Sequence, residues 1–172
     1  MMKSFAFLCV VLASVGCQAP VPPVPHALAA PAPQPTAAPT SPCVDVKGIH
    51  HLPDPRFTPG KLCSPQDPDF SGYRYPAHVP YCTRDIGGKE KDLVAREYGI
   101  PRSDYHLYEF DHLVPLSSGG SNDANNLWPQ PLDEAHDKDK VEDRAYNGLK
   151  NGTLTQEQAV QMLHAWRPAS CP

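Results

Sequence analysis

The sequence predicts an α+β domain, a short β-hairpin flanked by helices, in the C-terminal half of the chain. Nine of the 22 prolines fall in residues 20–42 and seven more lie between Pro53 and Pro80, where they disfavour continuous helix or sheet. Polar and apolar side chains alternate within residues 106–128, and apolar residues recur at helical spacing before and after that stretch. The foldable part of the chain therefore lies in its second half.

The first 17 residues have the pattern of an export signal, in which a charged start precedes an apolar run over residues 4–15. That run is too short to span a bilayer stably. Gly16 and Cys17 resemble the lipobox of bacterial lipoproteins, in which the cysteine is lipidated, although Ser14 stands where an aliphatic residue is usual. An ordinary signal cut within residues 19–30 is the alternative. We expect an exported protein, either an outer-membrane lipoprotein held only by its lipid, a periplasmic protein or a secreted one.

Composition divides the rest of the chain into three parts. Residues 18–42 are rich in Pro and Ala and predict an extended, disordered tether, residues 43–80 predict a loop-rich segment, and residues 81–172 predict the folded domain. Without Cys9 and Cys17, four cysteines remain for an oxidising compartment, which predicts two disulfide bonds. Their pairing stays open, and a zinc site is the weaker interpretation because no Cys-x-x-Cys pair exists.

Turn residues and periodicity place the elements of the domain. Gly88 before the helical face, and Gly99 with Pro101 after it, predict a helix over residues 89–98. A strand over residues 106–116, a glycine turn at 119–120 and a short strand within 123–128 form the predicted hairpin. Two further helices are expected, over 133–149 and, after the capping box Thr155 to Gln158, over 156–166.

The hairpin carries a recognisable motif. Residues 109–116 read EFDHLVPL, paired glycines follow at 119–120, and residues 125–129 read NNLWP. This succession resembles the HNH endonuclease family, whose ββα-metal hairpin carries Asp-His, Pro-Leu, paired Gly and a downstream Asn-Leu. The resemblance continues through residues 133–166 and covers about half of the chain. It implies a metal-dependent hydrolase that cleaves phosphodiester bonds in DNA, or in RNA, and leaves 5′-phosphate ends.

The chemistry of cleavage gives the motif residues their expected roles. A histidine with its usual pKa of about 6.5 has a neutral fraction at physiological pH, so His112 can act as general base on water. The family's geometry implies that Asp111 holds a divalent metal ion, with a second ligand from the following helix, which we assign to His136. Asp137, Asp139 or Asn126 are alternatives for this second ligand.

The remaining candidates are supporting residues and cations. The resemblance implies that Asn126 steadies the hairpin loop and so orients the general base, with Asn125 as the neighbouring alternative. Glu109 is either an acceptor that supports the site or a solvated strand residue. Carboxylate ligands favour Mg²⁺ or Mn²⁺, whereas an Asp with a His could also hold Zn²⁺ or Ni²⁺. Phosphate contacts are assigned to four cations, for which a solvated surface is the alternative: Arg84, Lys138, Lys140 and Arg144.

The net charge of the predicted domain is unfavourable for binding nucleic acid. From Arg84 to Pro172 the chain holds ten Lys or Arg against fifteen Asp or Glu, a balance of 10 − 15 = −5, whereas nucleic-acid-binding proteins usually carry a basic surface. We therefore expect modest, salt-dependent affinity for nucleic acid. We also expect the protein to be a monomer. The alternative function is a non-catalytic envelope lipoprotein that keeps the hairpin as a metal-stabilised binding module, and the intact set of Asp111, His112 and Asn126 counts against it.

Overall fold

The computed structural model describes residues 43–45 and 47–171. The predicted export signal, the tether and Cys17 fall in residues 1–42 and lie outside the described residues. Within the described part of the chain, no helix is both long and apolar enough to span a membrane.

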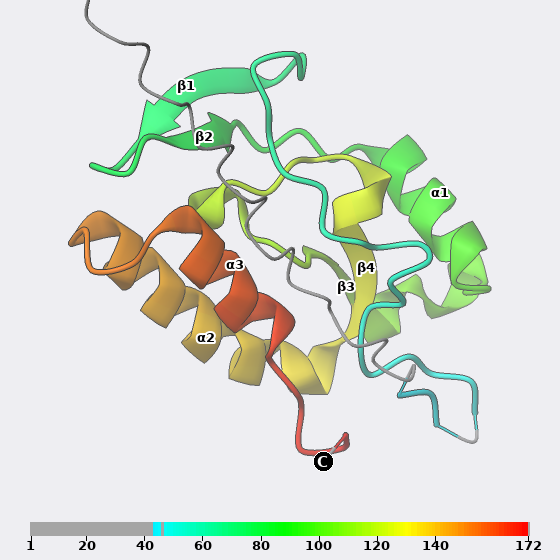
Figure 1. Cartoon of the computed structure of the whole chain (residues 1–172). Helices are drawn as coiled ribbons and strands as arrows, with labels where there is room; N and C mark the ends of the chain where they lie inside the picture. The colour runs from blue at the N-terminus through cyan, green and yellow to red at the C-terminus, as the bar shows by residue number, and fades with distance from the viewer. Residues whose placement is uncertain (1–42, 46, 172) are drawn as a thin grey trace, which may run out of the picture. The chain divides into compact units, whose positions relative to one another are not determined.

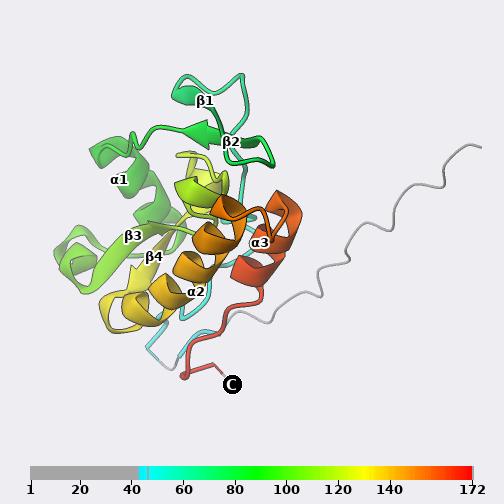
Figure 2. The ribbon, with the colours of Figure 1, turned by 90° about the vertical axis from the view of Figure 1, so that its left-hand side faces the viewer.

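The described residues form a mixed fold of three α-helices and two small antiparallel sheets (Figure 1). The β3–β4 hairpin lies between α1 and α2, and α3 packs along α2 (Figures 1 and 2). The elements are β1 (Phe70–Arg74), β2 (Val79–Cys82), α1 (Gly88–Glu97), η1 (Arg102–Leu107), β3 (Tyr108–His112), η2 (Leu116–Ser118), η3 (Ala124–Asn126), β4 (Leu127–Pro131), α2 (Leu132–Lys150) and α3 (Gln156–His164). This arrangement agrees with the predicted α+β class.

The predicted hairpin is present but shorter than expected. Its strands pair antiparallel from Tyr108 opposite Pro131 to His112 opposite Leu127. The first strand begins late because residues 102–107 form a 3₁₀-helix, which the alternation of side chains did not reveal. The second also begins late, because the Asp123 side chain accepts a hydrogen bond from the backbone N–H of Asn125 at 2.9 Å and caps a 3₁₀ turn there.

The three predicted helices are confirmed. α1 and α2 lie within one residue of their predicted bounds, and α3 ends at His164, two residues early. The capping box predicted at Thr155 forms, since its hydroxyl accepts from the Gln158 backbone N–H and the Gln158 side chain accepts from the Thr155 N–H. α2 has acidic residues in its first turn and Lys150 in its last, as the helix dipole favours.

Residues 43–69 run beside the hairpin loop and hydrogen-bond to its backbone, and residues 70–82 form the β1–β2 ribbon. Both predicted disulfide bonds are present, and their pairing is now defined as Cys43 with Cys171 and Cys63 with Cys82. The first bond ties the start of the described chain to its end across 128 residues, and the second holds the ribbon. Disulfide bonds are typical of oxidising or extracellular compartments.

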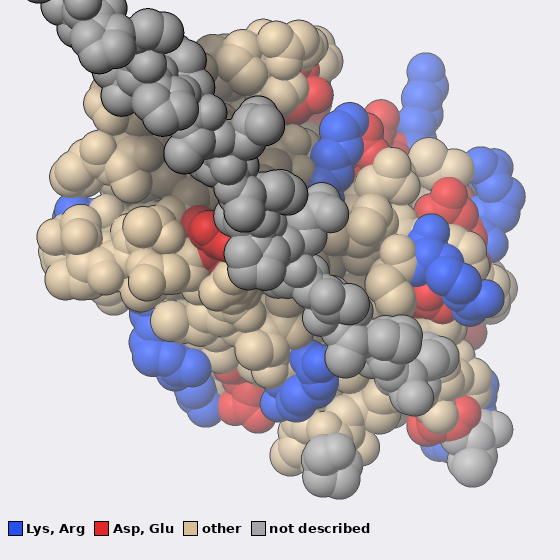
Figure 3. All heavy atoms as spheres, viewed as in Figure 1, with Lys and Arg blue, Asp and Glu red and all other residues tan. Residues whose placement is uncertain are grey.

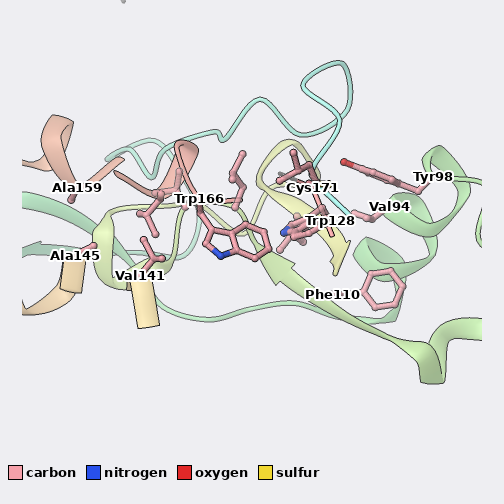
Figure 4. Close-up of a cluster of buried hydrophobic side chains, with 14 of the residues drawn as sticks. Val94, Tyr98, Phe110, Trp128, Val141, Ala145, Ala159, Trp166 and Cys171 are labelled. Carbon is pink, nitrogen blue, oxygen red and sulfur yellow. The ribbon is translucent and has the colours of Figure 1, made fainter. Parts of the chain in front are cut away.

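A single apolar core joins the helices to the hairpin (Figure 4). Trp128 of β4 is fully buried, and its ring centroid lies 6.3 Å from that of Trp166, which follows α3. Val94 of α1 and Phe110 of β3 are buried on the other side of the hairpin. The core therefore fixes β3 and β4 against helices on both sides, so the residues at the end of β3 have a rigid support.

Candidate functional site

The end of β3 places Asp111 and His112 on opposite faces of the hairpin, because successive side chains of a strand alternate. His112 is buried, whereas the Asp111 side chain keeps 18% of its surface exposed and faces α2. Gly120 closes the following turn so tightly that a Cβ there would lie 1.7 Å from the Val114 carbonyl oxygen. This position therefore requires glycine, as the paired glycines of the motif suggest.

His112 has the environment of a histidine that stays neutral. Burial lowers the pKa of His112, and the hydrogen bond to Asn122 and the charge of Asp111 only partly oppose this. Its Nε2 lies 3.1 Å from Oδ1 of Asn122. His112 Nδ1 forms no hydrogen bond with any of the described residues, and it is not among the fully buried nitrogen atoms that lack a partner. Nδ1 is thus the ring nitrogen without a hydrogen-bond partner among the described residues.

Asn126 holds the loop between the two strands, as expected for this position. It is fully buried, and its Nδ2 donates to the carbonyl oxygens of Val114 and Ser121, each at 2.9 Å. Its Oδ1 accepts from the Val114 backbone N–H at 2.9 Å. Asn125, the sequence alternative, is exposed. Because Asn126 is fully buried and all three bonds serve backbone groups, its side chain supports the loop.

We expect Asn126→Ala to lower the free energy of unfolding by about 3 kcal/mol, because three hydrogen bonds at about 1 kcal/mol each are lost. Chemical denaturation of the oxidised protein would measure this loss. Asn125→Ala is the matched control, since it removes a neighbouring exposed amide and should change stability by less than about 0.5 kcal/mol. Equal effects of the two substitutions would contradict this assignment.

Lys138 does not contact solvent, which corrects its prediction as a phosphate-binding residue. Its side chain is 1% exposed, and Nζ donates to Asp111 Oδ2 at 2.6 Å, to the His112 carbonyl oxygen at 2.8 Å and to Glu142. Burial alone would lower the pKa of Lys138, but Asp111 and Glu142 outweigh it and raise the pKa. The ammonium group therefore joins α2 to the end of β3 and orients Asp111.

The site holds more carboxylate than ammonium charge. Burial raises the pKa of Glu142 to about 7 against the effect of Lys138, and Asp111 adds to the rise. Burial also raises the pKa of Glu109, and the charges of Asp111 and Asp139 act in the same direction. Glu109 is an exposed residue of β3, but it is close enough to Asp111 and Lys138 for their charges to act on its carboxyl group. This excess of carboxylate oxygens beside Asp111 fits a hard divalent cation.

The structure does not bring His136 to Asp111, contrary to the expected pairing. The His136 side chain is 85% exposed and its Nδ1 lies 4.0 Å from Asp139. Nor are two of the expected cations at the site, since the exposed Lys140 binds Asp137 at 2.7 Å and Arg144 is exposed. These residues lie on the solvent side of α2, whereas its inward face is formed by Lys138 and the apolar residues in phase with it. Of the predicted alternatives, Asp139 is the one near the site.

One group of three candidate metal-ligating side chains lies within 4.8 Å among the described residues, formed by Cys63, Asp67 and Cys82. It could hold an ion only after reduction, because the two sulfur atoms are joined in a disulfide bond. Asp67 is also engaged, since its Oδ2 accepts from the Ser64 backbone N–H at 2.7 Å. In the oxidised protein these three residues therefore stabilise the fold, through a disulfide bond and a hydrogen-bonded carboxylate.

Two surface hollows differ in charge. One of about 430 Å³ is lined by five carboxylates against a single cation, Lys89, so its charge repels phosphate. The other, of about 360 Å³, has two cations against one carboxylate and three aromatic rings, and its lining residues are Arg84, Lys91, Tyr105, Tyr108, Glu109, Phe110 and Leu132. Arg84 also lies near enough to His112 to lower its pKa. Only the second hollow combines cations and rings beside the candidate site.

Charges of both signs share the face of the molecule that Figure 3 shows. On the face shown in Figure 3, Lys and Arg side chains are interspersed with Asp and Glu side chains. Among the expected cations that are exposed, Arg84 is the one whose charge acts on His112. Comparison of the chain with models of protein families, with curated proteins and with solved structures gave no match.

Proposed function

We propose that the protein is an endonuclease of the HNH type, which hydrolyses phosphodiester bonds of DNA or RNA with the help of a divalent metal ion. The observation that carries this proposal is the environment of His112. A buried histidine whose pKa is lowered, with one ring nitrogen bonded and the other without a partner, stands next in sequence to a partly exposed carboxylate, Asp111. Hydrolysis of a phosphodiester needs a base for water and positive charge for the leaving oxygen. His112 can be the base, and Asp111 can bind a metal ion that supplies the positive charge.

In this proposal His112 accepts a proton from the attacking water. The hydrogen bonds of Asn126 keep the loop rigid, and Lys138 anchors both Asp111 and the His112 carbonyl. Asp111, with Glu109 and Asp139 close by, would hold the metal ion, which supplies charge stabilisation to the leaving oxygen when bound. Mg²⁺ or Mn²⁺ suits this donor set better than Zn²⁺ or Ni²⁺, because burial and neighbouring carboxylates raise the pKa of Glu109, whereas His136 is exposed and lies next to Asp139.

We expect cleavage to lose activity on the acid side with a midpoint below pH 6.5, because burial lowers the pKa of His112 from that value. The neutral form is the active base, so the rate falls as the pH falls through the folded-state pKa. The same shift lowers stability in acid, since the unfolded chain takes up a proton near its usual pKa of about 6.5 before the folded protein does. The pH profile of kcat/KM would measure the midpoint, and a midpoint above 7 would contradict this role.

Substrate is best placed over the hollow that contains Arg84. Aromatic rings can stack on bases, and Arg84 with Lys91 can neutralise phosphates. Arg84 also lies near enough to His112 for its charge to lower the pKa of that residue. We expect Arg84→Ala to raise KM and to reduce the slope of log affinity against log salt by about 0.9. Arg96→Ala removes an exposed arginine of α1 outside this hollow and serves as the control. An unchanged salt slope in Arg84→Ala would place the substrate elsewhere.

The function is tested by incubating the oxidised protein with plasmid, linear and single-stranded DNA and with RNA. Mg²⁺, Mn²⁺, Zn²⁺ and Ni²⁺ are added separately, and EDTA is the control. We expect cleavage with Mg²⁺ or Mn²⁺ that EDTA abolishes. Failure to cleave with every ion would favour the alternative, a non-catalytic module of the cell envelope.

We further propose that the protein acts as a monomer after export. One chain supplies every side chain that the proposed mechanism uses, and the two disulfide bonds suit an oxidising compartment. Detection of the protein in membrane fractions, and its loss from them in Cys17→Ala, would distinguish a lipid-anchored protein from a released one.

A further inference from the structure

Asn122 connects His112 to the disulfide-bonded ribbon. Its side chain donates through Nδ2 to the carbonyl oxygen of Thr83 at 2.7 Å and to Oδ2 of Asp69. Its Oδ1 lies 3.1 Å from His112 Nε2. Asn122 is 8% exposed and His112 2% exposed, so these contacts are shielded from water.

The partners of Asn122 fix the orientation of its amide. A carbonyl oxygen and a carboxylate can only accept hydrogen bonds, so the amide nitrogen must face Thr83 and Asp69. The amide oxygen then faces His112, and this oxygen also only accepts. Nε2 of His112 must therefore carry a hydrogen and donate it. In the neutral imidazole, the lone pair is then on Nδ1.

We propose that Asn122, held by Asp69 and the Thr83 carbonyl, is a positioning residue that fixes the tautomer of His112 and so makes Nδ1 the nitrogen that accepts a proton from water. The role of Nδ1 in catalysis rests on the proposed function, whereas the assignment of the tautomer rests on the hydrogen bonds alone.

The ribbon makes this arrangement rigid. The Thr83 backbone N–H donates to the Asp69 carbonyl oxygen at 2.9 Å, which holds the two acceptors side by side. Thr83 follows Cys82, whose disulfide partner Cys63 donates its backbone N–H to the Gly119 carbonyl at 2.9 Å. The segment before the motif thus supplies part of the support for its histidine.

The tautomer can be measured directly in the full oxidised protein. Long-range ¹⁵N–¹H correlation spectra at pH 8 distinguish a ring protonated at Nε2 from one protonated at Nδ1, and His112→Gln identifies the signals. We expect the Nε2–H form in the native protein. A native spectrum with the hydrogen on Nδ1 would overturn the inference, whether or not the protein cleaves nucleic acid.

Asn122→Ala tests the role of the amide. We expect a mixture of the two tautomers and a kcat lower by about 10- to 100-fold with little change in KM, as for loss of a residue that orients a reacting group. Asp69→Asn retains the Thr83 acceptor and should have a smaller effect on both readouts. Asn125→Ala, at an exposed neighbouring amide, should change neither. A folded Asn122→Ala protein that keeps both tautomer and kcat would overturn the role of Asn122.

The two proposals fail in different ways. A native protein with the Nε2–H tautomer that cleaves none of the tested nucleic acids supports the assignment of the tautomer but contradicts the nuclease proposal. Cleavage by a native protein whose His112 carries its hydrogen on Nδ1 supports the nuclease proposal but contradicts the assignment of the tautomer. Neither outcome depends on the stability of a variant, because both are read from the native chain.

Discussion

His112→Ala is expected to lower the rate of phosphodiester cleavage by about 100- to 10,000-fold, the usual contribution of a general base. The imidazole would be the group that takes a proton from the attacking water, and His112 is the residue next to Asp111 at the end of β3. Single-turnover cleavage of a labelled duplex, with protein in excess, would measure the chemical step.

Controls separate this loss from a loss of folding. His106→Ala removes an exposed histidine of η1 and should leave the rate unchanged. Circular dichroism and the midpoint of thermal unfolding should show that His112→Ala remains folded, although a buried side chain is lost. A folded variant that cleaves at the native rate would contradict the role of His112 as the base.

Lys138→Met is expected to lower the free energy of unfolding by about 3 kcal/mol, because removal of the buried ammonium group leaves two partly buried carboxylates without a compensating charge. Asp111 and Glu142 both face the ammonium group of Lys138, and the His112 carbonyl loses its donor as well. Methionine keeps the length of the side chain, so the loss of packing is small. Denaturation with urea would give the difference between native and variant proteins.

Lys140→Met is the matched control for this prediction. Lys140 lies two residues away on α2, is 59% exposed and pairs with the exposed Asp137, so its removal should cost less than about 1 kcal/mol. The second substitution Glu142→Gln, made in Lys138→Met, should restore part of the lost stability because it removes one of the unpaired charges. Similar losses for Lys138→Met and Lys140→Met would show that the buried ion pair contributes little.

The sequence revealed most of the fold because its signals are local. Capping residues, glycines and periodicity predicted the three helices within two residues of their observed bounds, and the hairpin was predicted with ends that were too long. A 3₁₀-helix has no strong sequence pattern, which explains why residues 102–107 were assigned in part to a strand. The β1–β2 ribbon was missed because its partner-dependent pairing and its prolines obscure alternation.

Helical phase would have corrected the residues assigned to α2. Lys138 lies three residues before Val141 and seven before Ala145, so it belongs to the inward face, whereas His136 does not. Residue type alone predicts the opposite arrangement, because lysine is usually exposed and histidine is a common metal ligand. The helical period is the stronger signal at these positions.

Other contacts at the site could not be predicted from the sequence. Asn122 lies close to the motif, but its partners Asp69 and Thr83 come from a segment without periodicity, 53 and 39 residues away. Disulfide pairing among four cysteines is likewise a property of the folded chain. The positions of Asp111 at the end of the first strand and of Asn126 before the second follow, in contrast, from the local sequence motif.

The identity of the product ends tests the central claim most directly. If His112 activates water and the 3′ oxygen of the preceding nucleotide leaves, native protein with Mg²⁺ or Mn²⁺ will release fragments with 5′-phosphate and 3′-hydroxyl ends. Such fragments are substrates for ligase without prior treatment, and labelling of their ends would quantify them. Fragments with 3′-phosphate or cyclic phosphate ends, or the absence of any fragment from folded, oxidised protein, would contradict the account.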